Sequence, residues 1–260
     1  MKVATWNING VKARLPVVLE WLREAGPDVA CLQEIKSVDE AFPREPFEEL
    51  GYTVETHGQK GFNGVAILSK APPEAISRGL PGDADDEQAR FMEAVFASPS
   101  GPLRIASLYL PNGNPIETPK YEYKLAWMDR LIAWTRERMG EEEAFALLGD
   151  YNVVPTTTDK FDSPGWETDA LWLLPSRKHY RSLRGLGLYD AIEAVGDEAG
   201  RYTFWDYQAG AWQKDRGMRI DHALLSPQAA DRLASARIEK HVRGWEKPSD
   251  HVPVVIELAG

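Results

Sequence analysis

The chain has only one cysteine among its 260 residues, so no internal disulfide can form. A zinc site built from several thiolates is excluded for the same reason. The cysteine, Cys31, lies in the apolar run Val29–Leu32, and we expect it to pack in the core. No run approaches the roughly 20 apolar residues that a membrane span needs, and the polar turn Asn7–Gly10 comes before an apolar stretch of signal-peptide length develops. We therefore expect a cytoplasmic protein with no membrane partner.

The chain also lacks the surplus of positive charge that usually accompanies binding to a polyanion, because its formal net charge is −10. The acidic residues crowd two expected loops, at 83–87 and 141–143, whereas basic residues gather elsewhere. One hypothesis is that the basic clusters converge on a single positive face; ordinary solvated charge explains each cluster equally well. The clusters are Arg177 to Arg181, Lys214 with Arg216 and Arg219, and Lys240 to Arg243.

The length of the chain and its 43% hydrophobic content are typical of one domain, which we expect to span residues 1–260. Apolar residues from Val11 to Ala25 share one helical face, and Gly26-Pro27 ends that helix. Further helices are expected at 120–139 and 180–187. About ten strands with few long helices indicate an α/β fold, with two packed sheets covered by helices. The strands are expected at 2–6, 28–35, 52–57, 64–69, 91–97, 103–110, 144–149, 219–225, 236–241 and 252–258.

Polar side chains stand at the ends of several of these strands, where a rigid scaffold can hold a catalytic group. Asp150 and Asn152 alternate directly after the apolar run 144–148, which places both on one side of an extended backbone and favours function over a plain turn. Asp221 opens a strand in which a buried carboxylate would need a partner, and a histidine suits that role. The full set of strand-end residues comprises Asn7, Glu34, Tyr109, Asp150, Asn152, Asp221, Asp250 and His251.

Some of these residues have a plainer explanation when taken singly. Asn7 fits the chemistry of the Asn-Gly turn at Asn9-Gly10, and Glu34 fits a solvated strand end. A helix cap or a surface loop would account for Ser249–His251. The apolar run 252–256 that follows makes His251 the entrance of a strand, which favours a functional role.

The carboxylates carry a stronger argument together than apart. Glu34, Asp150, Asp221 and Asp250 in one pocket would repel one another, so either some stay protonated or a divalent cation neutralises them. Hard oxygen ligands without cysteine favour Mg²⁺ or Mn²⁺. Such an ion screens the charge of a phosphate ester and stabilises the departing oxygen. The residue types therefore predict a metal-dependent phosphodiesterase.

Eight short motifs, in order from residue 3 to about residue 258, resemble the exonuclease III branch of the endonuclease/exonuclease/phosphatase superfamily. The resemblance implies a four-layer α/β sandwich with the active site at one end of the paired sheets. It also implies Mg²⁺ as cofactor, with Mn²⁺ as a substitute, and a monomer that acts on double-stranded DNA with abasic sites or blocked 3′ ends. The motifs are Ala4–Gly10, Leu32–Lys36, Gly64–Ser69, Tyr109–Gly113, Gly149–Asn152, Arg201–Trp205, Arg219–Asp221 and Ser249–His251.

The resemblance assigns metal and water ligands. Glu34 would be the principal metal ligand, with Asn7 and Asp250 beside it. Asp150 and Asn152 would hold the attacking water and the scissile phosphate, or a second ion, so the number of metals stays open. Asp150 would be the general base, since its carboxylate would lie within hydrogen-bond reach of the water.

The resemblance also assigns groups that bind phosphate. His251, oriented by Asp221 through a hydrogen bond, would bind a phosphate oxygen and stabilise the pentavalent transition state. Tyr109 would direct its hydroxyl to the same phosphate or to the leaving group. Arg90 and Asn112 would contact phosphate as well, although Arg90 fits a surface salt bridge equally well.

A DNA-binding pocket is implied further along the chain. Taken alone, the alternating aromatic and polar residues of 202–207 describe an ordinary strand and hairpin. In the family, this region forms an apolar pocket for a base-free sugar and a wedge that enters the duplex. Met218 departs from relatives that carry tryptophan there, which leaves the strictness of the pocket open. The pocket residues are Phe204, Met218 and Ile220, and the wedge residue is Trp212.

The favoured function is an abasic-site endonuclease with 3′-to-5′ exonuclease and 3′-phosphodiesterase or phosphatase activity. A relative that acts on RNA, a lipid headgroup or an inositol phosphate would use the same metal chemistry. A catalytically silent DNA-binding or scaffold protein would keep the fold alone, and the complete polar set argues against it.

Overall fold

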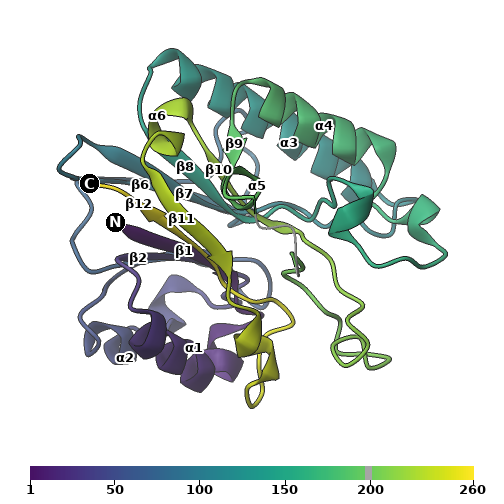
Figure 1. The fold of residues 1–260 in the computed structure, drawn as a ribbon, viewed down its shortest axis with the longest axis horizontal. Coiled ribbons are helices and arrows are strands. Elements are labelled where there is room, and N and C mark those ends of the chain that lie inside the picture. The colour runs from purple at the N-terminus through teal and green to yellow at the C-terminus, as the bar shows by residue number, and fades with distance from the viewer. Residues whose placement is uncertain (197–200) are drawn as a thin grey trace.

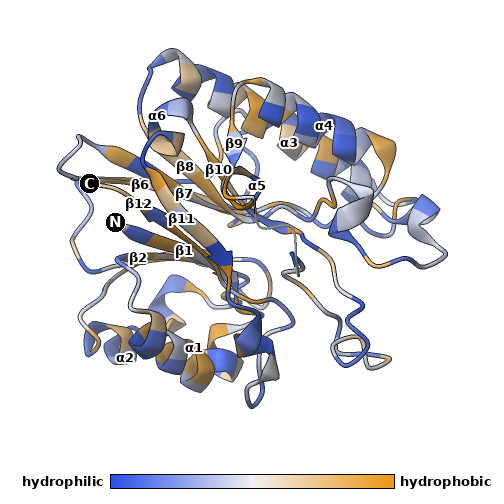
Figure 2. Ribbon diagram, in the orientation of Figure 1, coloured by the Kyte–Doolittle hydropathy of each residue, from blue (hydrophilic) through white to orange (hydrophobic). Residues whose placement is uncertain are grey.

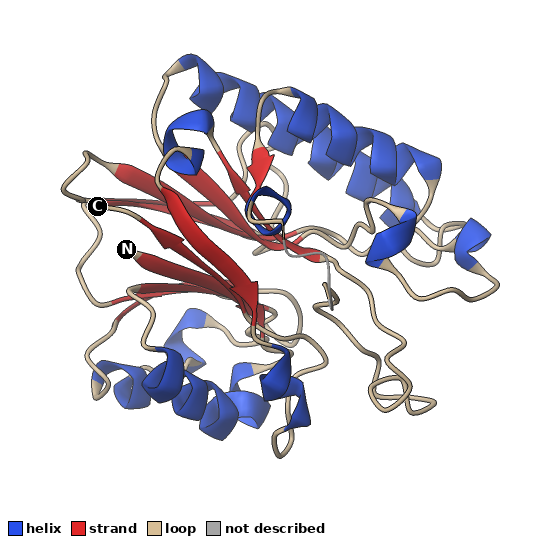
Figure 3. Ribbon diagram, in the orientation of Figure 1, coloured by secondary structure: helices blue, strands red, loops and turns tan. Residues whose placement is uncertain are grey.

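Two six-stranded sheets pack against each other and carry helices on their outer faces. The computed structural model describes residues 1–196 and 201–260. Figure 3 shows the strands as two layers in the middle of the molecule, with helices on both sides of the pair. Both sheets are mixed, because each combines parallel and antiparallel strands. The four-layer α/β sandwich expected from the sequence is confirmed.

The first sheet contains, in spatial order, β11 (Leu233–Ile238), β12 (Val254–Leu258), β1 (Lys2–Asn7), β2 (Val29–Gln33), β4 (Val65–Ser69) and β3 (Thr53–His57). The parallel strands β1 and β2 are connected by α1 (Val11–Ala25). Val18, Trp21 and Leu22 pack on this sheet, which explains why the apolar stripe forms a helix here. Gly26 ends the helix in the left-handed conformation, with φ 55°. The short helix α2 (Glu45–Glu48) lies beside α1 (Figure 1).

The second sheet contains, in spatial order, β5 (Ala75–Arg78), β6 (Phe91–Phe96), β7 (Leu103–Tyr109), β8 (Phe145–Asp150), β10 (Asp221–Leu225) and β9 (Tyr189–Asp190). Its outer face is covered by α3 (Pro119–Gly140) and α4 (Leu174–Gly185) (Figure 1). Two one-turn helices, α5 (Ala191–Ala194) and α6 (Pro227–Ala230), flank β10. Within the described residues, no helix combines the length and the apolar character needed to cross a bilayer.

Apolar side chains from both sheets fill the space between them. Figure 2 shows the strands largely in the colours of hydrophobic residues, whereas the outer helices alternate between the two extremes. Val65 and Ile256 of the first sheet belong to the same buried cluster as Met92 and Leu148 of the second. Cys31 lies in this cluster without any exposure, and burial raises the pKa of its thiol to about 12. The expectation that the single cysteine packs in the core is confirmed.

Several elements differ from the sequence prediction. The helix expected at 180–187 already begins at Leu174, because a proline in the first turn is compatible with helix initiation. β5 and β9 were missed, since β5 is an exposed edge strand without an alternating buried face and β9 has only two residues. The hairpin expected after 202 is wrong. One isolated bridge joins Phe204 to Met218, and the segment between them folds as a loop.

The two ends of the sandwich carry different parts of the chain. Strands β1, β2, β7 and β8 all finish at the end drawn on the right of Figure 1, and β10 and β12 begin there. The chain termini meet at the other end, where the Leu258 backbone N–H donates to the Met1 carbonyl at 2.9 Å. The polar strand-end residues therefore gather at one end and the termini at the other.

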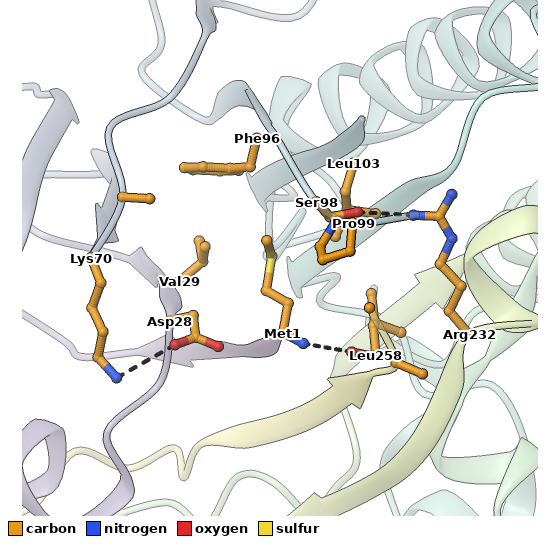
Figure 4. Close-up of a pocket in the computed structure, with 13 residues that line it drawn as sticks. Met1, Asp28, Val29, Lys70, Phe96, Ser98, Pro99, Leu103, Arg232 and Leu258 are labelled. Carbon is orange, nitrogen blue, oxygen red and sulfur yellow. Dashed lines mark hydrogen bonds and ion pairs between the residues drawn. The ribbon is translucent and has the colours of Figure 1, made fainter. Parts of the chain in front are cut away.

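A cavity of about 300 Å³ lies at the end that carries the termini (Figure 4). Its lining is mainly apolar, with Met1, Phe96 and Leu103 among the residues around it. The charged groups at its mouth have protein partners: Lys70 pairs with Asp28 at 3.5 Å, and Arg232 donates to Ser98 at 3.3 Å. The charged side chains at its mouth are therefore paired within the protein.

A buried ionic network is centred on Arg219, just before the start of β10. Arg219 is fully buried, and its three nitrogens reach three carboxylates: Asp159 at 2.6 Å, Asp190 at 2.6 Å and Glu193 at 2.9 Å. His222 Nδ1 lies 3.2 Å from the same guanidinium. Each buried carboxylate thus has a cation beside it, as burial of charge requires.

This network corrects the hypothesis of one positive face. Arg219 is fully buried, and Arg243 is only 7% exposed and donates to the Trp205 carbonyl at 3.0 Å. Neither guanidinium faces solvent as DNA binding would require. Two members of the predicted face are therefore structural cations, which balance buried carboxylates and carbonyls instead.

Replacing Arg219 with methionine should destabilise the protein by about 3–5 kcal/mol, because Asp159 and Asp190 would stay buried without their cation. Denaturant unfolding at pH 7 measures the loss. Lys70→Met is the matched control: it breaks an exposed pair with Asp28 and should lower stability by less than about 1 kcal/mol. Similar losses of unfolding free energy in the two variants would contradict the proposed contribution of the network to stability.

The network also predicts how stability depends on pH. Burial alone would raise the pKa of Asp190, but Arg219 and His222 outweigh it and hold that pKa well below its usual range. Because the folded pKa is depressed, the stabilisation is present above the ordinary aspartate pKa of about 3.9 and is lost as the pH falls below it. Arg219→Met should therefore flatten the fall of Tm below about pH 4, measured by thermal unfolding. If the dependence of Tm on pH did not change, other carboxylates would be responsible for the loss of stability in acid.

Candidate active site

The polar strand-end residues of both sheets meet at one end of the sandwich. β8 places Asp150 in register with Asp221 of the neighbouring β10 and with Tyr109 of β7. From the other sheet, β1 ends at Asn7, and Glu34 follows β2 directly. The adjacency predicted from strand ends is therefore present in the structure.

A histidine and two aspartates form the centre of this cluster. The possible ligand atoms of Asp150, Asp221 and His251 all lie within 4.8 Å of one another, and all three residues are buried. His251 Nδ1 is 2.8 Å from Asp221 Oδ2, and its Nε2 is 3.8 Å from Asp150 Oδ2. The hydrogen bond expected between Asp221 and His251 is present and fixes the orientation of the imidazole.

Asn7 connects the carboxylates of the two sheets. Its amide nitrogen donates to Glu34 Oε1 and to Asp150 Oδ2, both at 2.9 Å. Its amide oxygen accepts from the Asn9 backbone N–H at 3.1 Å. In this arrangement Asn7 presents a donor to the carboxylates, so its role as a metal ligand stays a prediction. Its contacts show that it holds Glu34 and Asp150 together.

Two residues that sequence reasoning missed complete this side of the site. Lys36 Nζ lies 3.0 Å from Glu34 Oε2, and Asn9 Nδ2 donates to Asp250 Oδ1 at 3.1 Å. The available signal was the pair of opposite charges at Glu34 and Lys36; both residues adopt a left-handed backbone, which strand alternation does not describe. Asp250 is brought to the edge of the cluster, as predicted.

The Asp150–Asn152 turn is held by a second set of contacts. The Asn152 backbone N–H donates to Asp150 Oδ1 at 2.9 Å, and Asn112 Nδ2 donates to Asn152 Oδ1 at 3.0 Å. Asn152 adopts a left-handed backbone, with φ 46°, which asparagine tolerates better than most residues. A Cβ at Gly149 would lie 1.9 Å from the Leu108 carbonyl oxygen, so only glycine fits before Asp150.

Lys124 of α3 also supports this turn, and the sequence analysis did not predict that role. It is fully buried on α3, and its Nζ donates to the carbonyls of Asn152 at 2.6 Å and Asn112 at 3.1 Å. Burial lowers its pKa to about 7, against the opposing charges of Asp150 and Asp169. The available signal was a lysine four residues before Met128, on the apolar face of the predicted helix.

Tyr109 and Arg90 form the wall next to Glu34. The Arg90 guanidinium lies 4.8 Å from the centre of the Tyr109 ring and donates to the Tyr109 carbonyl at 3.2 Å. Burial, followed by the charges of Glu34 and Asp150, raises the pKa of Tyr109 well above its usual range. The phenol therefore keeps its proton and can donate a hydrogen bond.

The charges of the cluster are strongly coupled. Burial alone would lower the pKa of His251, but Asp221 and then Asp150 outweigh it and raise that pKa to about 10. Burial raises the pKa of Asp150 to about 7, although the charge of His251 opposes the rise. The pKa of Glu34 is lowered: burial alone would raise it, but hydrogen bonds from Asn7 and the charge of Lys36 prevail. The site thus holds an imidazolium next to carboxylates, and among these the pKa of Asp150 lies close to neutral pH.

The donor set fits a divalent cation. Asp221 Oδ1 is buried and has no hydrogen-bond partner among the described residues. The other ligand atoms of the cluster are carboxylate oxygens, because the protonated His251 has no lone pair to offer, and none is a thiolate. Hard oxygen donors of this kind bind Mg²⁺, Mn²⁺ or Ca²⁺ in proteins. A buried acidic and histidine cluster that can hold a metal ion is therefore present, and its chemistry leaves open which ion binds.

The predicted pocket residues lie beside this cluster. Phe204 and Met218 line a cavity of about 420 Å³, whereas Ile220 is 2% exposed and packs against both of them without lining the cavity. The Phe204 and His251 rings meet edge-on with centroids 4.9 Å apart. Trp212 does not line this cavity but packs edge-on against Trp205 at 4.9 Å. Phe204 and Met218 thus line one cavity, as the sequence predicted, whereas its lining residues from the preceding segment were missed: Phe161, Ser163, Pro164, Gly165, Trp166 and Asp169.

Comparison with known proteins agrees with this geometry. Residues 4–251 match the model of the Endonuclease/Exonuclease/phosphatase family. The chain is 36% identical to exodeoxyribonuclease III of Haemophilus influenzae, over 99% of this chain and 100% of that protein. Among solved structures, the 3′ phosphatase NExo from Neisseria, bound to a product DNA hairpin, is 35% identical with a TM-score of 0.94 and covers 100% of both chains. An AP endonuclease from Archaeoglobus fulgidus is 34% identical with a TM-score of 0.93, over 99% of each chain.

Replacing Asp221 with asparagine should lower the pKa of His251 from about 10, because burial then acts without its strongest opposing charge. We expect the imidazole to lose its proton at a lower pH than in the unmodified protein, where it stays charged through neutral pH. An NMR titration of the His251 ring in EDTA measures this directly. Asp129→Asn, which removes the exposed partner of His179, is the control and should leave His251 unchanged. An equal pKa in the two variants would contradict the assignment.

Proposed function

Because the chain belongs to the Endonuclease/Exonuclease/phosphatase family, we propose that it is a metal-dependent DNA-repair phosphodiesterase of the exodeoxyribonuclease III type. Its reactions are hydrolysis of duplex DNA 5′ to abasic sites, 3′-to-5′ exonuclease action and removal of 3′ blocking groups. The observation that carries the proposal is the buried cluster of Asp150, Asp221 and His251 at the meeting point of both sheets. Full-length identity of 36% to an exodeoxyribonuclease III supports DNA as the substrate.

The finer features of the proposal follow from this substrate and site. Residues 1–260 act as one domain, which the core cluster shared by both sheets supports. The protein works as a monomer, in the cytoplasm where its DNA substrate lies. Mg²⁺ is the cofactor, with Mn²⁺ as a substitute, because the cluster offers carboxylate oxygens and no thiolate.

Phosphate binding falls to the donors around the cluster. His251 is positively charged near neutral pH and stands against Asp221, so its Nε2–H is free to donate to a phosphate oxygen. Tyr109 keeps its proton and adds a second donor. Arg90, beside Tyr109, and Asn112, bonded to Asn152, supply the outer contacts to the DNA backbone. Donors fixed in this way stabilise the charge that develops in the pentavalent transition state.

Asp150 is suited to take the proton of the attacking water. Burial raises its pKa to about 7, and a general base works best when its pKa lies near the working pH. Asn7 and Asn152 each hold one of its oxygens, so its orientation is fixed. These contacts make it the strongest candidate among the carboxylates of the cluster.

Glu34 is the principal residue that we propose for the metal, with Asp250 and Asn7 beside it and Asp150 and Asn152 on the opposite sheet. These residues would hold a divalent ion, which would supply positive charge against the phosphate. Lys36, paired with Glu34 at 3.0 Å, balances the same carboxylate. The cavity beside His251, lined by Phe204 and Met218 with Ile220 packed against them, takes the sugar of the abasic site, and Trp212 contacts the duplex.

Two alternatives have distinct consequences. A relative that acts on RNA or another phosphate ester would cleave its substrate with the same cluster, and Trp212→Ala would then leave its activity on an abasic duplex unaltered. A catalytically silent DNA-binding protein would lose no activity in Asp150→Asn or His251→Ala. The full-length match to nucleases favours the DNA-repair function over both.

The direct test is incision of a duplex oligonucleotide that carries one abasic analogue, with Mg²⁺ and then with EDTA. We expect incision only with the metal. His251→Ala and Asp150→Asn should each reduce turnover at least about 100-fold, the usual effect of losing a transition-state donor or a general base. Glu34→Gln should be partly restored by excess Mn²⁺, because its loss weakens metal binding.

Glu74→Gln is the matched control for this series, since Glu74 is exposed and lies outside the cluster. It should retain full turnover. Incision in EDTA would refute the mechanism. Equal and mild losses in all three site variants would mean that the roles are assigned to the wrong residues.

A further inference from the structure

Helix α4 carries a concentration of positive charge that the catalytic cluster does not use. Its twelve residues include four lysines and arginines and no aspartate or glutamate, in a chain whose formal net charge is −10. Figure 2 shows hydrophilic residues along much of this helix. Among the described residues, three of its cations form no ion pair, and we call them the α4 strip: Arg177, Lys178 and Arg181.

The placement of these charges is unfavourable for the helix itself. Arg177 and Arg181 are four residues apart, where like charges are neighbours and destabilise a helix. Arg177 also lies in the first turn, at the positive end of the helix dipole, where a cation is disfavoured. Burial lowers the pKa of the Arg177 guanidinium, and the charge of Arg181 lowers it further. An anion bound across the α4 strip would offset each of these unfavourable interactions.

The α4 strip is accessible, and one of its side chains is already held in place. Lys178 and Arg181 are exposed. The Arg177 guanidinium lies 4.0 Å from the centre of the Trp172 ring, and its Nε donates to the Trp172 carbonyl at 2.8 Å. Lys160 Nζ lies 5.1 Å from the centre of the same ring. A guanidinium fixed in this way loses little rotamer freedom when it binds a phosphate.

Helix α4 begins at the end of the sandwich that carries the catalytic cluster (Figure 1). The Leu171 carbonyl, three residues before the helix, accepts from the Val154 backbone N–H at 2.9 Å. Val154 comes two residues after Asn152 of the Asp150–Asn152 turn. The first turns of α4 are therefore anchored beside the site, while the rest of the helix runs away from it.

The backbone also gives the spacing between the cluster and the positive charge. Successive isolated bridges connect Lys160 to Met218, Met218 to Phe204, and Phe204 to His251. Since paired segments lie about 4.8 Å apart, Lys160 is roughly 15 Å from His251. A duplex rises about 3.4 Å per base pair, so cations at or beyond this distance meet phosphates about four or more base pairs from the scissile bond.

We propose that the α4 strip binds the phosphate backbone of duplex DNA outside the active site, on one flank of the scissile bond. The inference rests on the proposed function and adds a second contact region for the same substrate. An acidic protein that binds a polyanion needs exposed positive charge, and Arg219 and Arg243 are too buried to supply it. The α4 strip provides that charge next to the site. It contributes to substrate affinity and takes no part in the chemical step.

The salt dependence of DNA binding tests this contact directly. A duplex with a central tetrahydrofuran abasic analogue is titrated in EDTA at several KCl concentrations and followed by fluorescence anisotropy. Each lost phosphate contact lowers the slope of log K against log[salt] by about 0.9. The double variant Lys178→Gln/Arg181→Gln should therefore have a slope smaller by about 1.8 and bind at least about fivefold more weakly near 0.1 M KCl.

Moving the abasic analogue along a duplex of about 20 base pairs shows which flank the α4 strip contacts. Analogues placed about three base pairs from either end give two further substrates of equal length and charge. On one of them the flank ends before it reaches the strip, so the double variant and the unmodified protein should share one KM in Mg²⁺. On the other two substrates the KM of the double variant should rise at least about fivefold while kcat stays the same.

Arg136→Gln is the matched control for the single variant Arg181→Gln, because each removes one exposed positive charge from an outer helix. Arg136 lies near the end of α3, which finishes shortly before β8 begins at the end remote from the cluster. Arg181→Gln should lower the salt slope by about 0.9. Arg136→Gln should leave the slope and all three KM values unchanged.

Three results would overturn the inference. Unchanged salt slopes and KM values in variants with an unaltered Tm would exclude DNA from the α4 strip, leave an acidic protein as its partner and let the proposed function stand. An equal effect of Arg136→Gln would show that only net charge matters. A KM increase on all three substrates would rule out a contact confined to one flank. Failure of the unmodified protein to incise any of the three duplexes in Mg²⁺ would count against the proposed function itself.

Discussion

Mutual repulsion among buried carboxylates is the constraint around which this end of the molecule is organised. Asp150 and Asp221 are almost fully buried and converge with His251, while Glu34 approaches from the other sheet. Such a group persists only if positive charge or donors compensate it. The imidazolium of His251, the ammonium of Lys36 and the amide of Asn7 supply that compensation within the protein. The same negative potential is what makes the site attractive to a divalent cation.

The sandwich allows this convergence because strands of both sheets finish at the same end. No single segment contributes more than a few of the groups, so the cluster depends on the contact between the sheets rather than on a local motif. Gly149 illustrates how closely the strands approach, since the Leu108 carbonyl occupies the space of any larger side chain. Packing of the core and geometry of the site are therefore coupled: a shift between the sheets would separate Asn7 from Asp150.

Much of this arrangement was predictable from the sequence, and the remainder was not for identifiable reasons. The apolar stripe of α1 and the polar residues that end the strands are local patterns, so they predicted both the fold and the candidate site. The roles of Arg219 and Lys124 depend on partners far away: Asp159 lies 60 residues before Arg219, and the Asn152 carbonyl follows Lys124 by 28. Composition records such charges but not their burial. The Asn7 amide nitrogen likewise points toward its carboxylate neighbours because of their positions in the fold. The periodicity of the sequence does not describe those positions.

The pairing of the two chain termini opposite the site has a practical consequence. Met1 and Leu258 exchange backbone hydrogen bonds, so the ends of the polypeptide emerge side by side on the face remote from the catalytic cluster. A fused domain, an affinity tag or a surface tether attached there would leave the approach of a nucleic acid unobstructed. A short linker across the same gap would allow circular permutation, with new ends opened in a surface loop, while β1 and β12 stay paired.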